Sequence, residues 1–411
     1  MVITGVGAVT PAGRTSAETF SGVLAAQSQV GPITAWDPTG HPVGFAAEIV
    51  DFDPRRWLEP RDARRVDRVG LLGIAAAEEA LAQAGLRTQD DTRDGIDPTR
   101  VAVVIGSGVG GISTLESQIE VRVNRGPDRV GPLLIPMMMA NATAGLVALR
   151  HGFRGAALSV STACASGANS IGEAAAMIRA GRADVVVAGG TEAAITPTAM
   201  AAFARMGALS GRHHDPATAS RPFDRDRDGF VMGEGAGIVV LESEAHATRR
   251  GAEVLGELAG YGATCDAHHL TAPDPDGLGA TACMREALAD ARLTPSDIAH
   301  VNAHGTSTPL NDAAESAALT EVFGMHGPPV TSTKGVTGHL VGAAGAVEAI
   351  LGLLAARAQQ VPPVANLVES DDHCTIDLVR DGARPIPFGP VVSNSFGFGG
   401  HNASLVLIPA P

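Results

Sequence analysis

A lone cysteine, Cys164, lies where a strand-like run ends and a helix-like segment begins. The run 156–160 is short and apolar, whereas the segment 171–180 is rich in alanine and stops at Gly181. A thiol at the start of a helix meets free N–H groups and the positive end of the helix dipole, which favour the thiolate. A buried structural role is the commoner use of a single cysteine, so Cys164 needs partners before it indicates catalysis.

Two histidines and a lysine in glycine-rich stretches of the second half supply such partners. His304 lies in the stretch 302–308, and His339 closes the stretch that begins at Lys334. A thiolate attacks acyl groups, and neutral imidazoles donate hydrogen bonds to a developing oxyanion. This set of side chains therefore indicates acyl transfer through a thioester, followed by chemistry on a carbanion that a carbonyl group stabilises.

The elements that must position these side chains form an approximate repeat of about 150–200 residues. The first half, 1–250, carries Cys164, and the second half, 251–411, carries the histidines and Lys334. In each half a short strand-like run leads into a Gly/Ala-rich helix, past Cys164 in one and past Lys334 in the other. Alternating strands and helices predict two βαβ-type halves. If the halves pack with twofold pseudosymmetry, Cys164 and Lys334 face a common site.

Several other motifs resemble known sites but lack a required part. The loop 106–111 follows a strand and matches the dinucleotide fingerprint GxGxxG, yet no second strand ending in an acid follows at the expected distance. The segment 224–229 imitates the start of a calcium loop, but Gly235 occupies the position of the bidentate glutamate. Zinc on His304 and His339 lacks a third ligand at a recognisable spacing, and no GxSxG elbow indicates a serine hydrolase.

Composition places the chain among large globular proteins with an extensive core. Its 411 residues exceed what one core usually serves, and its net charge of −14 disfavours nonspecific binding to nucleic acid. The four cysteines include no CxxC pair, which argues against zinc and a disulfide framework and fits a reducing cytoplasm. No apolar run reaches the roughly 18 residues that a membrane helix needs. We therefore expect a cytoplasmic protein without a membrane or nucleic-acid partner.

The residues that carry the chemistry also resemble those of a known family. Four stretches, 162–167, 302–308, 332–339 and 394–400, are similar to motifs of β-ketoacyl-acyl-carrier-protein synthases of the elongating Cys-His-His class. The likeness is greatest to the synthase II type, which includes type II polyketide ketosynthases, and it covers nearly the whole chain. It implies an acyltransferase with the thiolase fold, an α/β fold of two related βαβαβαββ halves in five αβαβα layers.

For the reacting groups, the resemblance implies a role residue by residue. Cys164 is the nucleophile that takes the acyl chain from a carrier protein. His304 and His339 promote decarboxylation of the malonyl-carrier protein and steady the enolate. Lys334 holds the histidines and Glu348 in place by its charge. No metal is expected.

Around the reacting groups, the resemblance implies an oxyanion hole, a gate and a substrate channel. The backbone N–H groups of Cys164 and Phe398 form the oxyanion hole, and Phe398 is also the gate, because its flanking glycines let the backbone swing. The enzyme binds no cofactor of its own; the carrier protein delivers its phosphopantetheine arm. The side chains expected to contact the arm or the acyl chain are Thr306, Thr308, Val109, Phe203 and Phe396.

Partner proteins follow from the same resemblance. The acidic carrier protein, in its acyl and malonyl forms, is expected to dock on arginines, namely Arg64, Arg65, Arg68 and Arg205. The subunit is expected to pair with a second copy or with a chain-length-factor-like subunit, in fatty-acid or polyketide synthesis.

Two alternative functions stay open. One is a nondecarboxylating thiolase-like transferase, which usually carries a second cysteine where this chain has residues 399–402 without one. The other is a catalytically silent scaffold for acylated carrier protein.

Overall fold

Within the described residues, ten strands form one sheet, with the strands of the first half of the chain on one side of its centre and those of the second half on the other. The computed structural model describes residues 1–86, 96–325, 327–371 and 374–411. β1 and β8 join the halves at the centre through the pairs Val2–Glu257 and Ile3–Gly256. From the centre outwards, the first half contributes β1 (Val2–Val9), β7 (Gly235–Glu242), β6 (Val185–Glu192), β4 (Val101–Gly106) and β5 (Ala157–Leu158). The second half contributes, in the equivalent order, β8 (Gly256–Cys265), β14 (His401–Pro409), β13 (Val391–Gly397), β9 (His300–Asn302) and β10 (Val330–Thr331).

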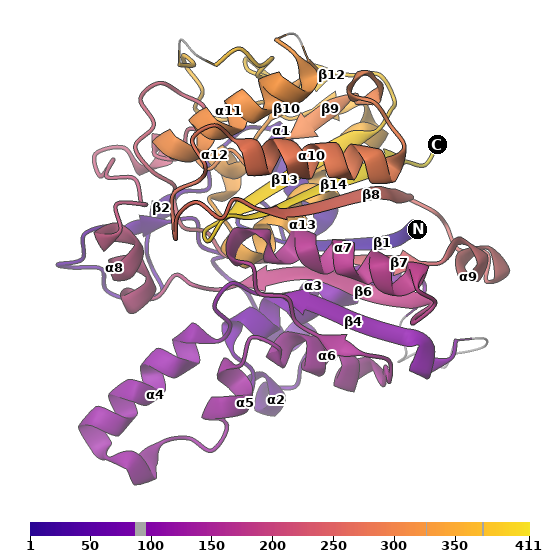
Figure 1. Cartoon of the computed structure of the whole chain (residues 1–411). Coiled ribbons are helices and arrows are strands. Elements are labelled where there is room, and N and C mark those ends of the chain that lie inside the picture. Colours follow the sequence, from indigo (N-terminus) through magenta and orange to yellow (C-terminus); the bar gives the residue numbers. More distant parts are fainter. Residues whose placement is uncertain (87–95, 326, 372–373) are drawn as a thin grey trace.

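Helices cover the sheet in three layers, which gives the predicted αβαβα arrangement (Figure 1). The middle layer consists of α7 (Ser166–Arg179) and α13 (Ala344–Ala358), and α13 contacts strands of both halves. The outer layer of the first half contains α3 (Arg68–Gln83) and α6 (Ala142–His151). In the second half, α10 (Leu278–Ala291) covers β8 and β14, and α11 (Pro309–Phe323) packs beside it.

Alternate glycines let the outer helices lie directly on the two central strands. A Cβ atom on Gly5 or Gly7 of β1 would lie 2.1 Å from a backbone carbonyl oxygen of α3. Gly260 and Gly262 of β8 make the same approach to α10, also at 2.1 Å. The same contact in both halves is the structural form of the repeat. It also explains how a chain with only 3% aromatic residues builds a close-packed core.

The apolar helix of the middle layer corrects one prediction. Residues Val341–Ala358 form an 18-residue helical stretch with a mean hydropathy of 1.5, long and apolar enough to cross a membrane, although no such run was expected. In this structure, 83% of that stretch is buried inside the protein. A helix packed on all sides is apolar all round, and α13 lies between the strands of the two halves.

The structural counterpart of Cys164 is Gly342 rather than Lys334. Cys164 lies in η5 (Ala163–Ala165) directly before α7, and Gly342 lies in η8 (Val341–Ala343) directly before α13. In both turns the preceding residue has a positive φ, 50° at position 163 and 46° at position 341. Lys334 instead begins α12 (Lys334–Thr337), an extra short helix between β10 and η8. The two strands were aligned correctly, but the extra helix moves the equivalent turn further along the chain.

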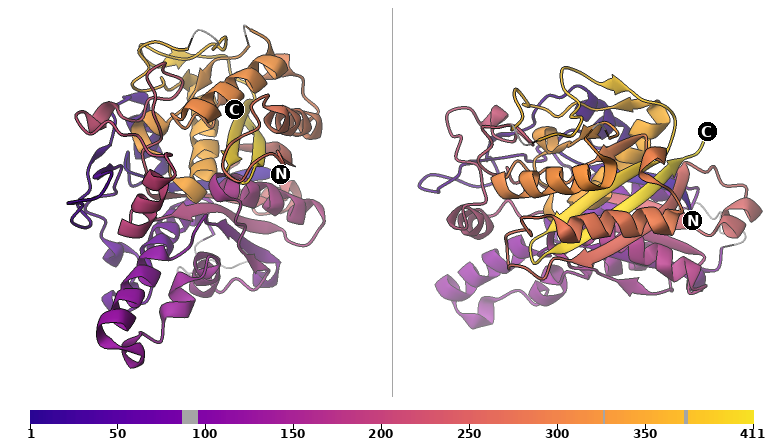
Figure 2. Two further views of the ribbon diagram at one scale, coloured as in Figure 1. Left: turned by 60° about the vertical axis from the view of Figure 1, so that its left-hand side comes forward. Right: turned by 45° about the horizontal axis from the view of Figure 1, so that its top comes forward.

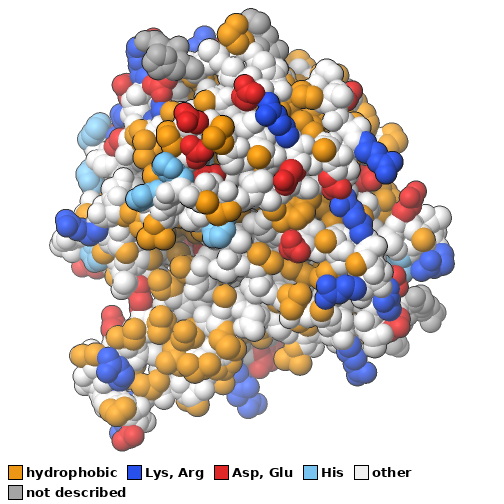
Figure 3. Space-filling model, in the orientation of Figure 1, with side chains coloured by type: hydrophobic (Ala, Val, Ile, Leu, Met, Phe, Trp, Pro, Cys, Tyr) orange, Lys and Arg blue, Asp and Glu red, His pale blue; other side chains and the backbone are white. Residues whose placement is uncertain are grey.

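The remaining elements lie at the ends and edges of the sheet. α4 (Ile112–Arg125) and α5 (Leu134–Met138) form an arm that projects from the body, as the views in Figure 1 and Figure 2 agree. Apolar side chains gather on this arm (Figure 3), among them Ile119, Val123, Leu133, Ile135 and Met139. The other elements are α1 (Ser16–Leu24), α2 (Pro60–Ala63), α8 (Pro197–Arg205), α9 (Glu244–Arg249), β2 (Gly31–Pro32), β3 (Phe45–Ala46), β11 (Gln360–Val361), β12 (Arg384–Pro385), η1 (Pro54–Arg56), η3 (Pro98–Arg100), η4 (Pro127–Arg129), η6 (Pro216–Thr218) and η7 (Pro295–Asp297).

Candidate active site

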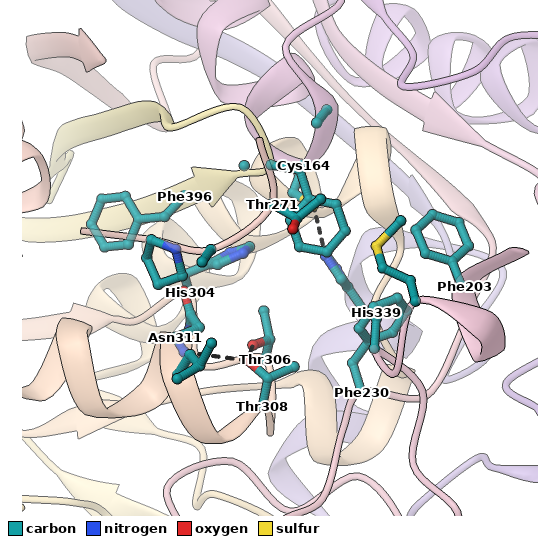
Figure 4. Close-up of a pocket in the computed structure, with 18 of the residues that line it drawn as sticks. Cys164, Phe203, Phe230, Thr271, His304, Thr306, Thr308, Asn311, His339 and Phe396 are labelled. Atoms are coloured by element: carbon teal, nitrogen blue, oxygen red, sulfur yellow. Dashed lines mark hydrogen bonds between the residues drawn. The ribbon is translucent and has the colours of Figure 1, made fainter. Parts of the chain in front are cut away.

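A cavity of about 390 Å³ lies where the two halves meet, and it collects most of the side chains singled out in the sequence (Figure 4). Lys334 and Glu348 are buried and pair with each other behind His304. The arginines lie outside the cavity lining. The expected residues that do line it are Cys164, His304, His339, Phe398, Thr306, Thr308, Val109, Phe203 and Phe396.

Cys164 lies at the start of the central helix α7, and its Sγ is 3.0 Å from Nε2 of His339. Burial raises the pKa of the thiol to about 11, although the charge of Lys334 and a hydrogen bond from the N–H of Phe398 act in the opposite direction. The expectation that the helix start favours the thiolate is therefore wrong for the resting site, because desolvation outweighs it. A neutral thiol would need a base to act as a nucleophile.

His339 is placed to take that proton. Its backbone N–H donates to the carbonyl oxygen of Val231 at 2.7 Å, and its backbone carbonyl oxygen accepts from the N–H of Gly233 at 2.9 Å, so the backbone is held on both sides. Burial, followed by the charge of Lys334, lowers the pKa of the imidazole well below its ordinary value. The ring is therefore neutral, and its Nε2 can act as the acceptor for the proton of Cys164.

His304 lies beside His339, with ring centroids 5.3 Å apart and an angle of 80° between the ring planes. The N–H groups of His304 and Gly305 each donate to a carboxylate oxygen of Glu315 at 2.7 Å, which fixes this loop. Burial and the charge of Lys334 lower the pKa of His304 well below its ordinary value. Nζ of Lys334 lies 3.4 Å from Nδ1 of His304. Because an ammonium group only donates, Nδ1 is the acceptor and Nε2 carries the proton.

Lys334 is the only lysine in the sequence; every other basic residue apart from histidine is an arginine. Its side chain is 1% exposed, and its ammonium group contacts the carboxylate of Glu348 and both Nδ1 and the carbonyl oxygen of His304. Burial raises the pKa of Glu348, and the contact with Lys334 opposes that rise. A compact ammonium group can serve several converging acceptors, whereas a planar guanidinium is larger and rigid. The single lysine was therefore a signal in the sequence for a position of special chemistry.

The loop 397–400 brings the backbone of Phe398 against Cys164. A Cβ atom on Gly397 would lie 2.7 Å from the carbonyl oxygen of Thr162 and 3.1 Å from the backbone nitrogen of Cys164, so only glycine allows this approach. The last two glycines of the loop have φ values of 85° and 73°, which also favour glycine. The ring of Phe398 lies 6.4 Å from the ring of Phe203 on the cavity wall. The backbone N–H of Phe398 bonds the sulfur of Cys164, and an N–H group beside the nucleophile is a candidate donor for an oxyanion hole.

Thr306 and Thr308 lie side by side below His304 in the cavity (Figure 4). Their hydroxyl oxygens are 2.9 Å apart and hydrogen-bonded to each other. Thr308 is also the N-cap of α11, and its hydroxyl accepts from the N–H of Asn311 at 3.4 Å. Behind the pair, the buried carboxylate of Asp312 accepts from the N–H of Ser307 at 3.1 Å. The two hydroxyls are therefore held in place before a ligand arrives.

The glycine loop 106–111 forms a wall of the cavity through Val109. The carboxylate of Glu192, at the end of β6, accepts from the Ser107 hydroxyl at 2.9 Å and from the N–H groups of Gly108 at 2.7 Å and Gly342 at 3.1 Å. The loop N–H groups that would cradle a phosphate thus already bind a carboxylate, which argues against a dinucleotide site.

Glu192 and Glu315 are two buried groups of this site that were not singled out in the sequence. Burial raises the pKa of each carboxyl to about 7, against the hydrogen bonds that the carboxylates accept. Glu192 ties the glycine loop to the turn before α13, and Glu315 orients the loop of His304. The contact between Glu192 and Gly342 spans 150 residues of chain, so no local spacing indicates it.

The arginines expected to dock a carrier protein do not all present free charge. Arg64 and Arg65 are exposed, and so is Arg205 at the end of α8. Arg68 instead forms an ion pair with the buried Glu234, with Nε 2.6 Å from a carboxylate oxygen. The positive charge of Arg68 is therefore paired with a carboxylate of the same chain. The partner lies 166 residues away in the sequence, so the run of arginines could not reveal this difference.

Cys164, His304 and His339 also bring three potential metal ligands within 4.8 Å of one another, which supplies the third ligand that the sequence lacked. The surroundings suit acyl chemistry better. The ammonium group of Lys334, 3.4 Å from Nδ1 of His304, opposes a second cation. Among the described residues, Nδ1 of His339 has no hydrogen-bond partner, whereas a metal-bound histidine usually bonds through its second nitrogen.

Known proteins resemble this chain over its whole length. The family model for the β-ketoacyl synthase N-terminal domain matches residues 1–247, and that for the β-ketoacyl synthase C-terminal domain matches residues 255–368. A 3-oxoacyl-acyl-carrier-protein synthase 2 of Synechocystis is 44% identical over 99% of this chain and 97% of its own length. The protein of the same name from Coxiella burnetii is 42% identical, covering 99% of this chain and 98% of its own.

Solved structures agree in fold. A β-ketoacyl synthase from Burkholderia phymatum has a TM-score of 0.92 and 35% identity, covering 100% of this chain and 99% of its own. The ishigamide ketosynthase/chain length factor has a TM-score of 0.91 and 36% identity with the same coverage. A type II polyketide acyl-carrier protein in complex with its ketosynthase has a TM-score of 0.90 and 32% identity, again with that coverage. With its fold, its cavity and these relatives, the chain belongs to the β-ketoacyl synthase family.

Proposed function

We propose that this protein catalyses a decarboxylative Claisen condensation. An acyl thioester held on Cys164 reacts with malonyl-acyl-carrier protein to give β-ketoacyl-carrier protein and carbon dioxide. The observation that carries the proposal is the 3.0 Å contact between Sγ of Cys164 and Nε2 of His339, with a second neutral histidine, His304, beside them in one cavity. Relatives named 3-oxoacyl-acyl-carrier-protein synthase 2 support it.

In the first half-reaction, Cys164 attacks the carbonyl carbon of the acyl-carrier thioester. The thiol proton moves to Nε2 of His339 as the C–S bond forms, which the neutral state of both groups requires. The backbone N–H groups of Cys164 and Phe398 stabilise the oxyanion, and each such preorganised donor contributes about 3–4 kcal/mol. The intermediate then expels the carrier thiolate, which takes the proton back from His339. The acyl group stays on Cys164.

In the second half-reaction, malonyl-carrier protein loses carbon dioxide at the two histidines. The bond to the carboxylate breaks, and its electron pair forms an enolate whose oxygen accepts a hydrogen bond from Nε2–H of His304. With Cys164 acylated, the neutral ring of His339 takes the tautomer that carries its proton on Nε2 and donates the second hydrogen bond. The enolate carbon attacks the acyl carbonyl on Cys164, and the Cys164 thiolate leaves and takes up one proton from water, which is the proton that the condensation consumes. Lys334 and Glu348 do not touch the substrate in this proposal. Paired with Glu348, the ammonium group of Lys334 holds His304 in the tautomer that donates from Nε2.

Two regions of the cavity wall would bind the two parts of the substrate, the phosphopantetheine arm and the acyl chain. Thr306 and Thr308 bind the phosphopantetheine arm through their paired hydroxyls. Val109, Phe203 and Phe396 contact the acyl chain with apolar surface. Phe398 is the gate, because the glycines around it let its backbone swing. No cofactor of the enzyme's own is needed for this chemistry.

The carrier protein would dock on exposed arginines. Arg64 and Arg65 carry the proposal; Arg205 lies in α8, which contributes Phe203 to the cavity wall. Charge reversal of Arg64 and Arg65 to glutamate should raise the KM for acyl-carrier protein about tenfold at low salt, and less at high salt because ions screen the attraction. An unchanged KM at low salt would exclude this docking face.

A second subunit would bind at the edge strand β5. This strand pairs with β4 only through residues 103–104, its Leu158 is 46% exposed, and the apolar arm lies on the same side of the molecule. The partner is a second copy or a chain-length-factor-like subunit. Leu158→Asp should convert the purified protein from dimer to monomer in light scattering. A monomeric wild type that dimerises only with a coexpressed partner would select the heterodimer.

The two halves, 1–250 and 251–411, serve the reaction differently in this proposal. The first half supplies the nucleophile, the acyl pocket and the dimer insertions, and the second supplies the histidines and Lys334. The protein would work in the cytoplasm, in fatty-acid or type II polyketide elongation.

One assay separates the proposal from its two alternatives. Wild-type protein is incubated with acyl-carrier protein and malonyl-carrier protein, and carbon dioxide and β-ketoacyl-carrier protein are quantified together. Equal amounts of both products support the synthase, and Cys164→Ala should abolish condensation. Condensation with an acetyl rather than a malonyl donor would indicate the thiolase-like transferase. Binding of acylated carrier protein without any transfer would indicate the scaffold.

A further inference from the structure

The acidic segment 224–229, which imitates the start of a calcium loop, does not gather its carboxylates around one point. Asp224 is buried and accepts from Nε of Arg221 at 2.9 Å and from the N–H of Val368 at 2.7 Å. Asp228 accepts from the N–H of Gly211 at 3.0 Å. The carboxylates therefore serve separate neighbouring segments, and the segment has another use.

Arg227 is the residue of this segment whose contacts indicate what the segment does. Its side chain is only 5% exposed. Its guanidinium group donates to the carbonyl oxygens of Thr308 at 3.2 Å, Pro309 at 3.0 Å and Asp224 at 2.9 Å. Five N–H donors in one rigid plane can reach such a set of acceptors, and no other side chain can do so. Arg227 thus links the segment 224–229 to the first turn of α11.

Two carboxylates complete the surroundings of Arg227. Asp371 pairs with Nη1, and Asp312 lies 3.6 Å from Nε. The same carboxylate oxygen of Asp312 accepts from the N–H of Ser307 at 3.1 Å. Ser307 has a φ of 71°, a left-handed conformation that costs energy for a residue other than glycine. The charge of Arg227 therefore stabilises the carboxylate that holds this strained residue, which lies between the two cavity threonines.

We propose that Arg227 is a positioning residue for the phosphopantetheine arm, acting through the loop that carries Thr306 and Thr308. The inference rests on the proposed function, in which these two threonines bind the arm. Arg227 does not touch the arm. It fixes the backbone of Thr308 from behind, and with Asp312 it fixes Ser307, so that both hydroxyls face the cavity at the spacing that the arm needs.

The test exchanges the guanidinium for an ammonium group in two neighbouring arginines. Arg227→Lys keeps the charge but cannot reach all three carbonyl oxygens. Arg225→Lys is the matched control, because Arg225 lies two positions earlier, is 44% exposed and pairs with the exposed Glu369. Misplacing a binding group by a fraction of an ångström lowers affinity steeply, so Arg227→Lys should raise the KM for malonyl-carrier protein about tenfold. The kcat should stay within about twofold, and Arg225→Lys should match the wild type.

A second readout distinguishes positioning from general damage to the site. Iodoacetamide alkylates Cys164 without using the threonines, so its rate should be the same in Arg227→Lys and the wild type. The proposal would be overturned if the alkylation rate and kcat fell by the same factor by which KM rose. An unchanged KM would also overturn it. If Arg227→Lys does not fold, Asp371→Asn decides, because it removes one partner of Arg227 at a side chain that is 37% exposed. A raised KM with normal alkylation is expected there too, and an unchanged KM overturns the proposal.

Thr308→Ala separates a failure of this inference from a failure of the proposed function. If wild-type protein makes no β-ketoacyl-carrier protein, the proposed function itself fails. If wild-type protein condenses and Thr308→Ala raises the KM while Arg227→Lys does not, the threonines bind the arm and Arg227 has no part in positioning them.

Discussion

Replacing His304 by alanine should separate the two half-reactions. Its Nδ1 faces Lys334, so Nε2–H is the donor left for a substrate oxygen. Loss of one preorganised donor costs about 3–4 kcal/mol, which lowers the rate of malonyl decarboxylation roughly 10²–10³-fold. Transfer of the acyl chain to Cys164 should change less than about tenfold, because the 3.0 Å contact between Cys164 and His339 does not involve the deleted ring.

Single-turnover measurements resolve the two steps. Acylation is followed by the mass of the intact protein after mixing with acyl-carrier protein, and decarboxylation by the conversion of malonyl-carrier to acetyl-carrier protein. His214→Ala is the matched control, since His214 is exposed and lies outside the cavity lining. Thermal unfolding must show that both variants are folded. Decarboxylation retained within tenfold in His304→Ala would refute the role given to this histidine.

Two further predictions concern charge inside the site. Lys334→Met should lower the free energy of unfolding by about 3–5 kcal/mol at pH 8, because it leaves the buried carboxyl of Glu348 unpaired. The pKa of Glu348 then lies still further above its ordinary value of 4.5, so the folded variant binds the proton more tightly than the unfolded chain and regains stability as the pH falls from 8 towards 5. Denaturant unfolding at both pH values measures this, with the double variant Lys334→Met, Glu348→Leu as the control that should be stable at either pH; a loss that does not depend on pH would contradict the assignment. For His304 and His339, whose pKa values lie well below 6.5, the imidazole signals in an NMR titration should stay those of the neutral ring as the pH falls from 8 through 6.5. A midpoint near 6.5 for either ring would contradict a neutral histidine pair.

The reacting residues could be predicted because each lies in a distinctive local stretch. Cys164 precedes an alanine-rich helix, and both histidines lie in glycine-rich loops, so motif and repeat together indicated one site. The division of the chain into two related halves of alternating strands and helices was also predicted from the repeat. The pairing of Cys164 with Lys334 in that repeat was wrong, because the extra helix α12 separates the lysine from the turn that corresponds to η5.

Beyond Lys334 and Glu348, the groups that hold the loops of the site and its surroundings in place could not be predicted, because their partners are distant in the sequence. Glu192 reaches Gly342 across 150 residues, and Arg68 reaches Glu234 across 166. Nothing in a local pattern distinguishes Arg68 from the exposed Arg65 three positions earlier. The charge state of Cys164 was also missed. The start of a helix is visible in the sequence, whereas the depth of burial that raises the thiol pKa depends on how the two halves pack.

The central claim is that Cys164 carries the acyl chain from one carrier protein to the enolate of another. The direct measurement is the mass of the peptide that contains Cys164, first after acyl-carrier protein is added and again after a chase with malonyl-carrier protein. The account predicts one acyl group on Cys164, followed by its loss as equal amounts of carbon dioxide and β-ketoacyl-carrier protein appear. An acyl group that stays on Cys164 through the chase, or condensation that proceeds without acylation of Cys164, would contradict it.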